Sequence, residues 1–96
     1  STLVALMGDW ELGRIVATPG ALDALAEAAQ SPVEFLSRHI RGDWGNCCDE
    51  DRQANEDALR YDARLFSIYH TSKGVKVWVI TEADRSSTCV LLPEEY

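Results

Sequence analysis

The sequence is poor in positive charge. Nine lysines and arginines stand against sixteen aspartates and glutamates, so the formal net charge at neutral pH is -7. Proteins that bind DNA or RNA through the phosphate backbone need a concentrated positive surface, because binding must displace the counterions of the nucleic acid. The charge balance therefore argues against direct nucleic-acid binding.

Long apolar runs are also missing. No stretch approaches the roughly 18 residues that a membrane-spanning helix requires, so we expect no contact with a membrane. The apolar residues Leu3–Met7 are too few for the core of a signal peptide, and no basic residue precedes them. We expect residues 1–9 to be a flexible or expression-derived segment. If Met7 is a natural start, the expression-derived part is residues 1–6.

Cysteine is scarce and unevenly spaced. Cys47 and Cys48 are neighbours, and Cys89 stands alone in an apolar run. An odd number of cysteines without a signal peptide indicates a reducing compartment, so we expect a cytoplasmic protein. Structural zinc sites use spaced cysteine pairs, which adjacent cysteines with Asp49 and His39 do not supply. No metal site is therefore predicted.

Motifs for cofactor binding and for nucleophilic catalysis are absent. The chain has no Gly-x-Gly-x-x-Gly, no Walker phosphate loop and no Gly-x-Ser-x-Gly sequence. We therefore expect no cofactor. The composition itself is that of an ordinary globular protein, because 46% of the 96 residues are hydrophobic and 26% are charged. A chain of this length fits one hydrophobic core, so residues 1–96 are expected to form a single α+β domain.

Between a first short strand and about residue 61, the apolar residues recur with the helical period. Thr18 and Ser31 are each followed by proline, which is typical of an N-cap and the first position of a helix. Ser31 and Glu34 also have the spacing of a capping box. The predicted helices span residues 19–29, 32–41 and 49–61.

The hydrophobic period then changes to two, which indicates β-strands. Tight polar turns at Lys73-Gly74 and at Glu82–Arg85 predict that the last three strands form an antiparallel meander. The predicted strands span residues 12–17, 65–71, 75–81 and 87–92. The expected fold class is α+β, with an antiparallel four-stranded sheet (one N-terminal strand plus the C-terminal meander) and about three helices packed on one face.

Both faces of this sheet carry large apolar side chains. Trp78 and Ile80 alternate with Val77 and Val79 and so face the opposite side. Helices can cover one face, and exposed apolar patches beyond roughly a few hundred Å2 are uncommon on monomers. We therefore predict a homodimer through the second sheet face, with coverage by Leu3–Trp10 as the alternative. The expected core consists of Ile15, Leu22, Leu25, Phe35, Leu36, Ile40, Leu59, Phe66, Ile68, Val77, Val79, Val90 and Leu92.

Two histidines are the natural general acids or bases near neutral pH. His39 precedes Arg41 and Asp43 at a predicted helix end, and His70 ends a strand beside Tyr69. If the fold brings these residues together, they would suit hydrolysis of a phosphodiester without a metal. They are therefore the catalytic candidates. The alternative is that His39 interacts with the negative end of the helix dipole and that His70 is exposed before a hairpin turn.

Three further features are candidates for binding a partner. One is the acidic start of the third predicted helix, another is the polar turn between the last two strands, and the third is a loop tryptophan. The acidic start would suit a basic protein partner, and the alternatives are ordinary solubility and a solvated turn. The candidate binding residues are Trp44, Asp49, Glu50, Asp51, Glu82, Asp84 and Arg85.

Several segments resemble a known family. They are Gly13–Leu22, Phe35-Leu36, His39–Gly45, Trp78–Ser86 and Leu91–Tyr96. They resemble small bacterial proteins of unknown function from plasmids and other mobile elements, of the plasmid-related protein type. The chain departs from this family at Asn46–Cys48, where the family carries acidic residues. The resemblance implies a bacterial, cytoplasmic, mobile-element setting and supplies no catalytic residues.

Several classes of function are therefore open. We expect a small accessory protein that acts by protein–protein binding, with its acidic surface as the binding module. The alternatives are a small-molecule-binding protein and a small metal-independent hydrolase or nuclease that uses His39 and His70. Convergence of the two histidines on one pocket would distinguish an enzyme from a binding protein.

Overall fold

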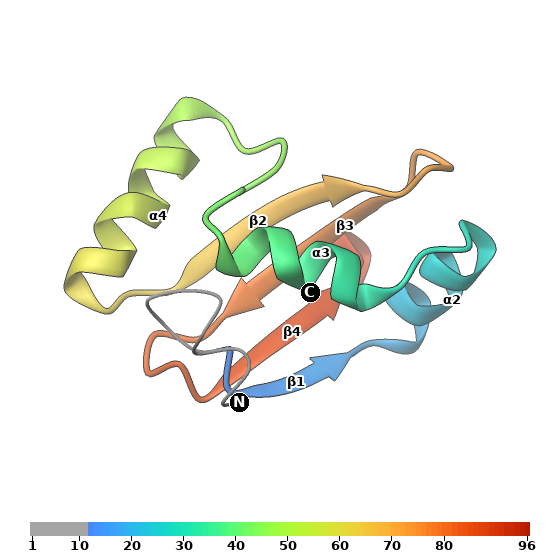
Figure 1. Ribbon diagram of the computed structural model, residues 1–96, viewed down its shortest axis with the longest axis horizontal. Coiled ribbons are helices and arrows are strands. Elements are labelled where there is room, and N and C mark those ends of the chain that lie inside the picture. The colour runs from blue at the N-terminus through green and yellow to red at the C-terminus, as the bar shows by residue number, and fades with distance from the viewer. Residues whose placement is uncertain (1–11) are drawn as a thin grey trace.

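A four-stranded sheet and three α-helices form the part of the chain that the computed structural model describes, residues 12–96 (Figure 1). In chain order the elements are β1 (Arg14–Ala17), α2 (Pro19–Glu27), α3 (Pro32–Ile40), α4 (Asp49–Tyr61), β2 (Leu65–His70), β3 (Lys76–Thr81), β4 (Ser87–Leu91) and a final 3-10 turn, η1 (Pro93–Glu95). The α+β class is the one the sequence predicts. The predictions for residues 1–9 and for Leu3–Trp10 lie outside the described residues.

The sheet is mixed, so the prediction of a wholly antiparallel sheet is wrong. Its strand order is β1-β4-β3-β2, and β2, β3 and β4 form the expected antiparallel meander. Strand β1, however, runs parallel to β4, with Arg14 opposite Ser87 and Ala17 opposite Val90. Short turns force neighbouring strands to be antiparallel. Since β1 reaches β4 only through all the intervening helices and strands, its direction is not fixed by any turn.

Local capping residues explain where the first two helices begin. The hydroxyl oxygens of Thr18 and Ser31 accept backbone N–H bonds from the first turns of α2 and α3, as predicted for N-caps. The predicted capping box of α3 does not form, because the Glu34 carboxylate accepts a bond from the Gln30 side chain instead. None of the helices within residues 12–96 has both the length and the apolar character needed to cross a membrane.

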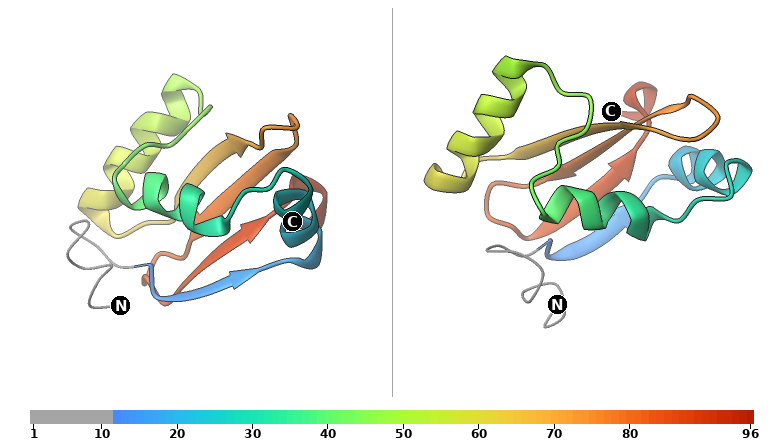
Figure 2. Two further views of the ribbon diagram at one scale, coloured as in Figure 1. Left: turned by 45° about the vertical axis from the view of Figure 1, so that its right-hand side comes forward. Right: turned by 45° about the horizontal axis from the view of Figure 1, so that its top comes forward.

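Helices α2 and α3 lie on one side of the sheet, and η1 lies on the other (Figure 2). We call the side under α2 and α3 the inner face. Its side chains include Ser67, Tyr69, Val77, Val79, Thr81, Thr88 and Val90. The core forms where Leu25, Phe35, Leu36 and Ile40 pack onto this face, with the Phe35 ring stacked on Tyr69 at 5.2 Å between centroids.

Some of the expected core residues lie elsewhere. Ile15 and Leu22 are about half exposed, at 48% and 47%, and Leu59 is 37% exposed. In α2 the buried side chains are Ala21, Ala24 and Leu25, so the helix turns small residues toward the sheet and Leu22 outward. Phe66 and Ile68, also expected in the core, are half-buried on the opposite face of the sheet.

The free edge of β2 is covered by α4 and by the loop before it. Asn55 of α4 donates from Nδ2 to the Phe66 carbonyl at 2.7 Å and accepts the Phe66 N–H at 2.9 Å. Further along the edge, Ile68 N–H donates to Trp44 O and Ile68 O accepts from Asn46 N–H. An open strand edge can pair with another chain, and these four bonds prevent that at β2. No further strand pairs with the other edge, β1, within residues 12–96.

We expect the substitution Asn55→Ala to lower the free energy of unfolding by about 2 kcal/mol, because it leaves the Phe66 N–H without its acceptor and removes one of the two donors to the Phe66 carbonyl, which retains the Cys47 thiol. Urea denaturation measures this change. Gln53→Ala on the same helix is the matched control, because Gln53 is exposed and bonds only to Asp57 among the described residues. Equal effects of the two substitutions would show that Asn55 does not hold the β2 edge.

Candidate functional site

His39 lies in the core and not at the protein surface. It is on the last turn of α3, and its side chain is fully buried. Its Nδ1 is 2.5 Å from Ser67 Oγ and its Nε2 is 2.9 Å from Thr81 Oγ1, so the imidazole joins α3 to β2 and β3. The Trp44 ring packs edge-on against it, at 5.7 Å between centroids.

Buried hydrogen bonds continue from His39 through Thr81 and Thr88 to the Leu12 carbonyl, and the last acceptor sets their direction. The Leu12 carbonyl can only accept, so the Thr88 hydroxyl donates to it at 2.6 Å. Thr88 must then accept from Thr81, at 2.7 Å, and Thr81 must in turn accept from His39 Nε2–H. His39 therefore carries a proton on Nε2, and its Nδ1 is hydrogen-bonded to the Ser67 hydroxyl. We call these five residues the buried polar chain.

The protonation state of His39 agrees with its surroundings. Burial lowers the pKa of His39 to about 3, and the positive charge of Arg85 acts in the same direction. The close serine and histidine have the arrangement of a nucleophile and its base. Ser67 is fully buried as well, however, so no substrate reaches this pair from the surface.

His70 does not share a site with His39. Side chains alternate along a strand, so His70 faces away from Ser67 and Tyr69, which contact the core. It is exposed and lies opposite Lys76 of β3. The structure thus places the two histidines on opposite faces of the sheet, and the convergence expected of an enzyme is not observed.

The other catalytic candidates have structural roles or point into solvent. Asp43 pairs with Arg38 at 2.8 Å, and the bond from this guanidinium is the main reason why the pKa of Asp43 is lowered. Tyr69 donates its hydroxyl to the Asp43 carbonyl, and burial raises the pKa of Tyr69. Arg41 is exposed at the end of α3. None of these residues approaches His70 in a common pocket.

The predicted binding residues are distributed over several places. Trp44 is buried and donates its indole N–H to Glu56 at 2.9 Å, so it is not available as an anchor. Arg85 donates to the carbonyls of Ala58 and Ala63, which ties the β3–β4 turn to the end of α4. In the same turn, Asp84 accepts the Ser86 N–H.

The acidic candidates lie apart from the aromatic ones. Asp49 and Glu50 are exposed on the first turn of α4, and Asp51 is half-buried beside them. Glu82 follows β3 and makes a 3.4 Å contact with Arg64. These carboxylates therefore do not form one surface with the loop tryptophan.

Metal binding has no support within residues 12–96, where no group of three or more His, Cys, Asp or Glu side chains is placed to hold an ion. Cys47 is buried and donates its thiol to the Phe66 carbonyl, and burial raises the pKa of this thiol. Cys48 is exposed, and Cys89 is half-buried with a pKa that burial also raises. Thiols of this kind are poor nucleophiles at neutral pH.

The side of the sheet away from α2 and α3, which we call the outer face, is strongly apolar. Its apolar side chains are Val16, Phe66, Ile68, Trp78, Ile80, Cys89 and Leu91, and its polar ones, at the strand ends, are Arg14, His70, Lys76 and Ser87. Helix α4 lies beside the β2 edge, where Ile68 packs against Trp44, Cys47, Ala58 and Leu65, and η1 lies over this face (Figure 2). Ile80 and Leu91 are buried, whereas Phe66, Ile68 and Trp78 stay half-buried and Val16 is 39% exposed.

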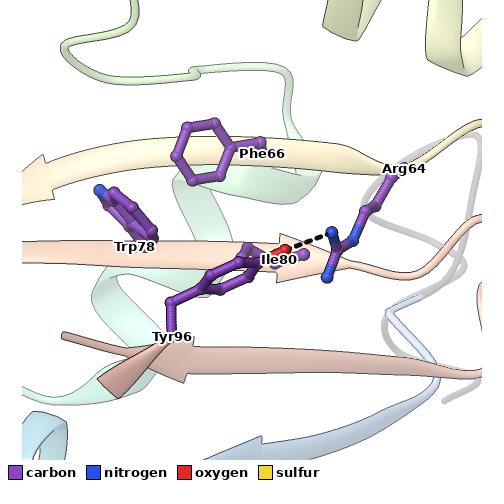
Figure 3. A pocket seen from close by; sticks show the side chains of 5 residues that line it. All are labelled: Arg64, Phe66, Trp78, Ile80 and Tyr96. Atoms are coloured by element: carbon purple, nitrogen blue, oxygen red, sulfur yellow. Dashed lines mark hydrogen bonds between the residues drawn. The ribbon is translucent and has the colours of Figure 1, made fainter. Parts of the chain in front are cut away.

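Aromatic rings surround a hollow on the outer face (Figure 3). Phe66 meets Trp78 edge to face at 5.0 Å, and Tyr96 meets Trp78 in the same manner at 5.8 Å. Ile80 forms the floor, and the Arg64 guanidinium at the rim donates to the Tyr96 hydroxyl at 2.7 Å. The hollow has a volume of about 240 Å3 and combines apolar walls with a single cation.

Glu95 holds the chain end over this hollow. Its carboxylate accepts bonds from the Thr18 hydroxyl, from Gly20 N–H and from Leu92 N–H, and the bond from Thr18 is the main reason why the pKa of Glu95 is lowered. A Cβ atom at Gly20 would lie 2.6 Å from this carboxylate, so a larger residue there would displace the Glu95 side chain from its present position. Tyr96 is thereby positioned by contacts at the start of α2.

Sequence reasoning identified part of the hollow. The strand alternation places Trp78 and Ile80 on one face, which the structure confirms. Tyr96 is an aromatic residue that could anchor a partner, but its contact with Arg64 was missed, because the two are 32 residues apart and no local pattern connects them. Comparisons with known proteins add nothing, since no family model, curated protein or solved structure matches this chain. The function must therefore be inferred from these residues and their geometry.

We expect the protein to lose stability as the pH falls below 6.5. The pKa of His39 is about 3 in the folded chain and 6.5 ordinarily, so folding favours the neutral ring. Its contribution is complete above pH 6.5 and is lost progressively between pH 6.5 and 3, to a limit of about 5 kcal/mol. Thermal unfolding followed from pH 7 to pH 4 measures the effect.

Two variants separate His39 from the many carboxylates. His39→Gln should be less stable at pH 7 and should show a flatter dependence on pH between 6.5 and 4. His70→Gln is the matched control and should keep the dependence of the parent chain, because His70 is exposed. An unchanged slope in His39→Gln would contradict a neutral, buried His39.

Proposed function

We propose that this chain is a protein-binding module rather than an enzyme, and that it binds a second copy of itself through the outer face. The observation that carries the proposal is the apolar row that crosses this face, with Ile68 opposite Trp78 and Trp78 opposite Leu91. The residues suited to proton transfer also support binding over catalysis, because His39 and Ser67 are buried and hydrogen-bonded to each other in the buried polar chain.

Side chains on the outer face are less completely buried than those on the inner face. Phe66, Ile68 and Trp78 are only half-buried, whereas Val77 and Val79 on the inner face are fully buried. Full burial of a large apolar side chain contributes roughly 1.5–3 kcal/mol, so a partner that covers this face gains the remaining part of that contribution for each half-buried residue. The indole N–H of Trp78 is covered but has no acceptor among residues 12–96, a cost that finished cores avoid.

Charge at the two ends of β3 supports a second copy as the partner. Lys76 begins the strand and Glu82 directly follows it. A two-fold axis that lies between two facing sheets and crosses β3 at a right angle brings Lys76 of each copy near Glu82 of the other. Closed two-fold dimers are the commonest oligomers, and this arrangement pairs opposite charges at both ends.

The other expectations from the sequence remain additions to this proposal. The acidic start of α4, Asp49–Asp51, lies away from the outer face and would leave room for a basic protein partner in the dimer. The bacterial, cytoplasmic, mobile-element setting rests on the sequence resemblance alone. Within that setting the chain would be an accessory protein that acts by binding.

We expect the chain to have twice the mass of one copy at micromolar concentration, measured by light scattering during size-exclusion chromatography. Ile68→Lys and Val16→Lys, both on the outer face, should raise the dissociation constant at least about a hundredfold, because each buries a charge at the interface. Val16 is 39% exposed, so its substitution spares the fold if Ile68→Lys does not.

Val33→Lys is the matched control, since Val33 is a 64% exposed residue of α3 away from the outer face. A charge exchange tests the two-fold arrangement directly. Lys76→Glu and Glu82→Lys should each weaken the dimer, and the double variant should restore it. A parent chain that stays monomeric, or a control that weakens the dimer as much as Val16→Lys, would overturn the proposal.

A further inference from the structure

We propose that the hollow on the outer face is a binding site for a small planar aromatic carboxylate. The inference goes beyond self-association and does not require it. Three properties of the site support it, which are the arrangement of the aromatic rings, the free capacity of the Arg64 guanidinium and the prior positioning of Tyr96 (Figure 3).

The walls suit a flat apolar ring. Phe66 and Tyr96 contact the Trp78 ring from different directions, at interplanar angles of 81° and 68°. Aromatic rings prefer edge-to-face and offset contacts, which a further ring inserted against Ile80 can make with these neighbours. An apolar cavity of roughly 150 Å3 accepts benzene, so the 240 Å3 here hold one ring with a small substituent.

The rim supplies recognition of a carboxylate. Arg64 has five N–H donors, of which one reaches the Tyr96 hydroxyl and another reaches Glu82 at the long distance of 3.4 Å. The remaining donors have no acceptor among residues 12–96. A guanidinium binds a carboxylate with two parallel bonds, a geometry that its planar fork favours. A ligand with two negative charges fits less well, because Glu82 and Glu95 lie near the hollow.

The site is formed before any ligand arrives. The Glu95 carboxylate is anchored at the start of α2, and the next residue, Tyr96, contacts both Trp78 and Arg64. The ring of Tyr96 is nevertheless 68% exposed, so one wall of the hollow faces solvent and leaves an entrance. A preformed site loses little conformational freedom on binding, which favours affinity for a small ligand.

Benzoate is the test ligand, and benzamide is its uncharged counterpart of nearly the same shape. Binding is followed by heteronuclear NMR at the Trp78 indole N–H, which is assigned with Trp78→Phe. For a ligand of this size we expect benzoate to bind with a Kd of about 1–10 mM. Benzamide should bind at least about tenfold more weakly, because it cannot form the charged pair with Arg64.

Arg64→Gln should reduce benzoate affinity at least about tenfold and change benzamide affinity less than about twofold. Arg14→Gln is the matched control, because Arg14 lies on the same face in β1 but does not line the hollow. Tyr96→Phe keeps the ring and should retain most of the affinity. Saturable shifts at Trp78 that disappear in Arg64→Gln support the site.

Equal binding of benzoate by the parent chain and by Arg64→Gln would overturn the inference, and so would an absence of saturable shifts both in the parent chain and in Val16→Lys, because the proposed dimer covers the face that holds the hollow. The titration is repeated with Val16→Lys, in which the proposed dimer is weakened while the hollow is intact. Failure of self-association is read from the mass and failure of the ligand site from the Trp78 shifts, so the two outcomes are distinguishable.

Discussion

The buried polar chain is the constraint on which the rest of the structure depends. Hydrogen bonds from Ser67 through His39, Thr81 and Thr88 to the Leu12 carbonyl join α3 to three strands and to the residues that lead into β1. Each bond is worth only about 1 kcal/mol, but each buried group left without its partner costs about 1–3 kcal/mol. The chain therefore holds as a unit, and the direction of its bonds from His39 to Leu12 is set by the last acceptor, which cannot donate.

This constraint decides which side of the sheet is available for function. Using His39 and Ser67 to hold the inner face together removes the only close serine–histidine pair of the described residues from contact with solvent. The remaining histidine, His70, is exposed and lies opposite Lys76, on the other side of the sheet from this pair. The outer face, in contrast, has apolar side chains and a guanidinium that are incompletely satisfied. In the proposed function these groups bind a partner rather than transfer protons.

The parts of the fold predicted from the sequence are those controlled by neighbouring residues. Thr18 and Ser31 fix helix starts within their own turns, and the alternation around Trp78 fixes which residues share a face. The errors concern partners far apart in the chain. The hydrogen bonds of His39 span 28 and 42 residues, and the direction of β1 depends on a strand at the other end of the described chain. A histidine at a helix end has the same local pattern whether it is buried or exposed.

The end of the chain connects the two faces. Glu95 completes the first turn of α2, which belongs to the inner layer, while Tyr96 forms a wall of the hollow on the outer face. A carboxylate at a helix N-terminus is favoured by the helix dipole and by the unpaired N–H groups there. Glycine at position 20 allows this close approach. Because Glu95 and Tyr96 are adjacent, the contact of Glu95 that stabilises α2 also sets the position of Tyr96. The shape of the hollow on the outer face therefore depends on how α2 packs on the inner face.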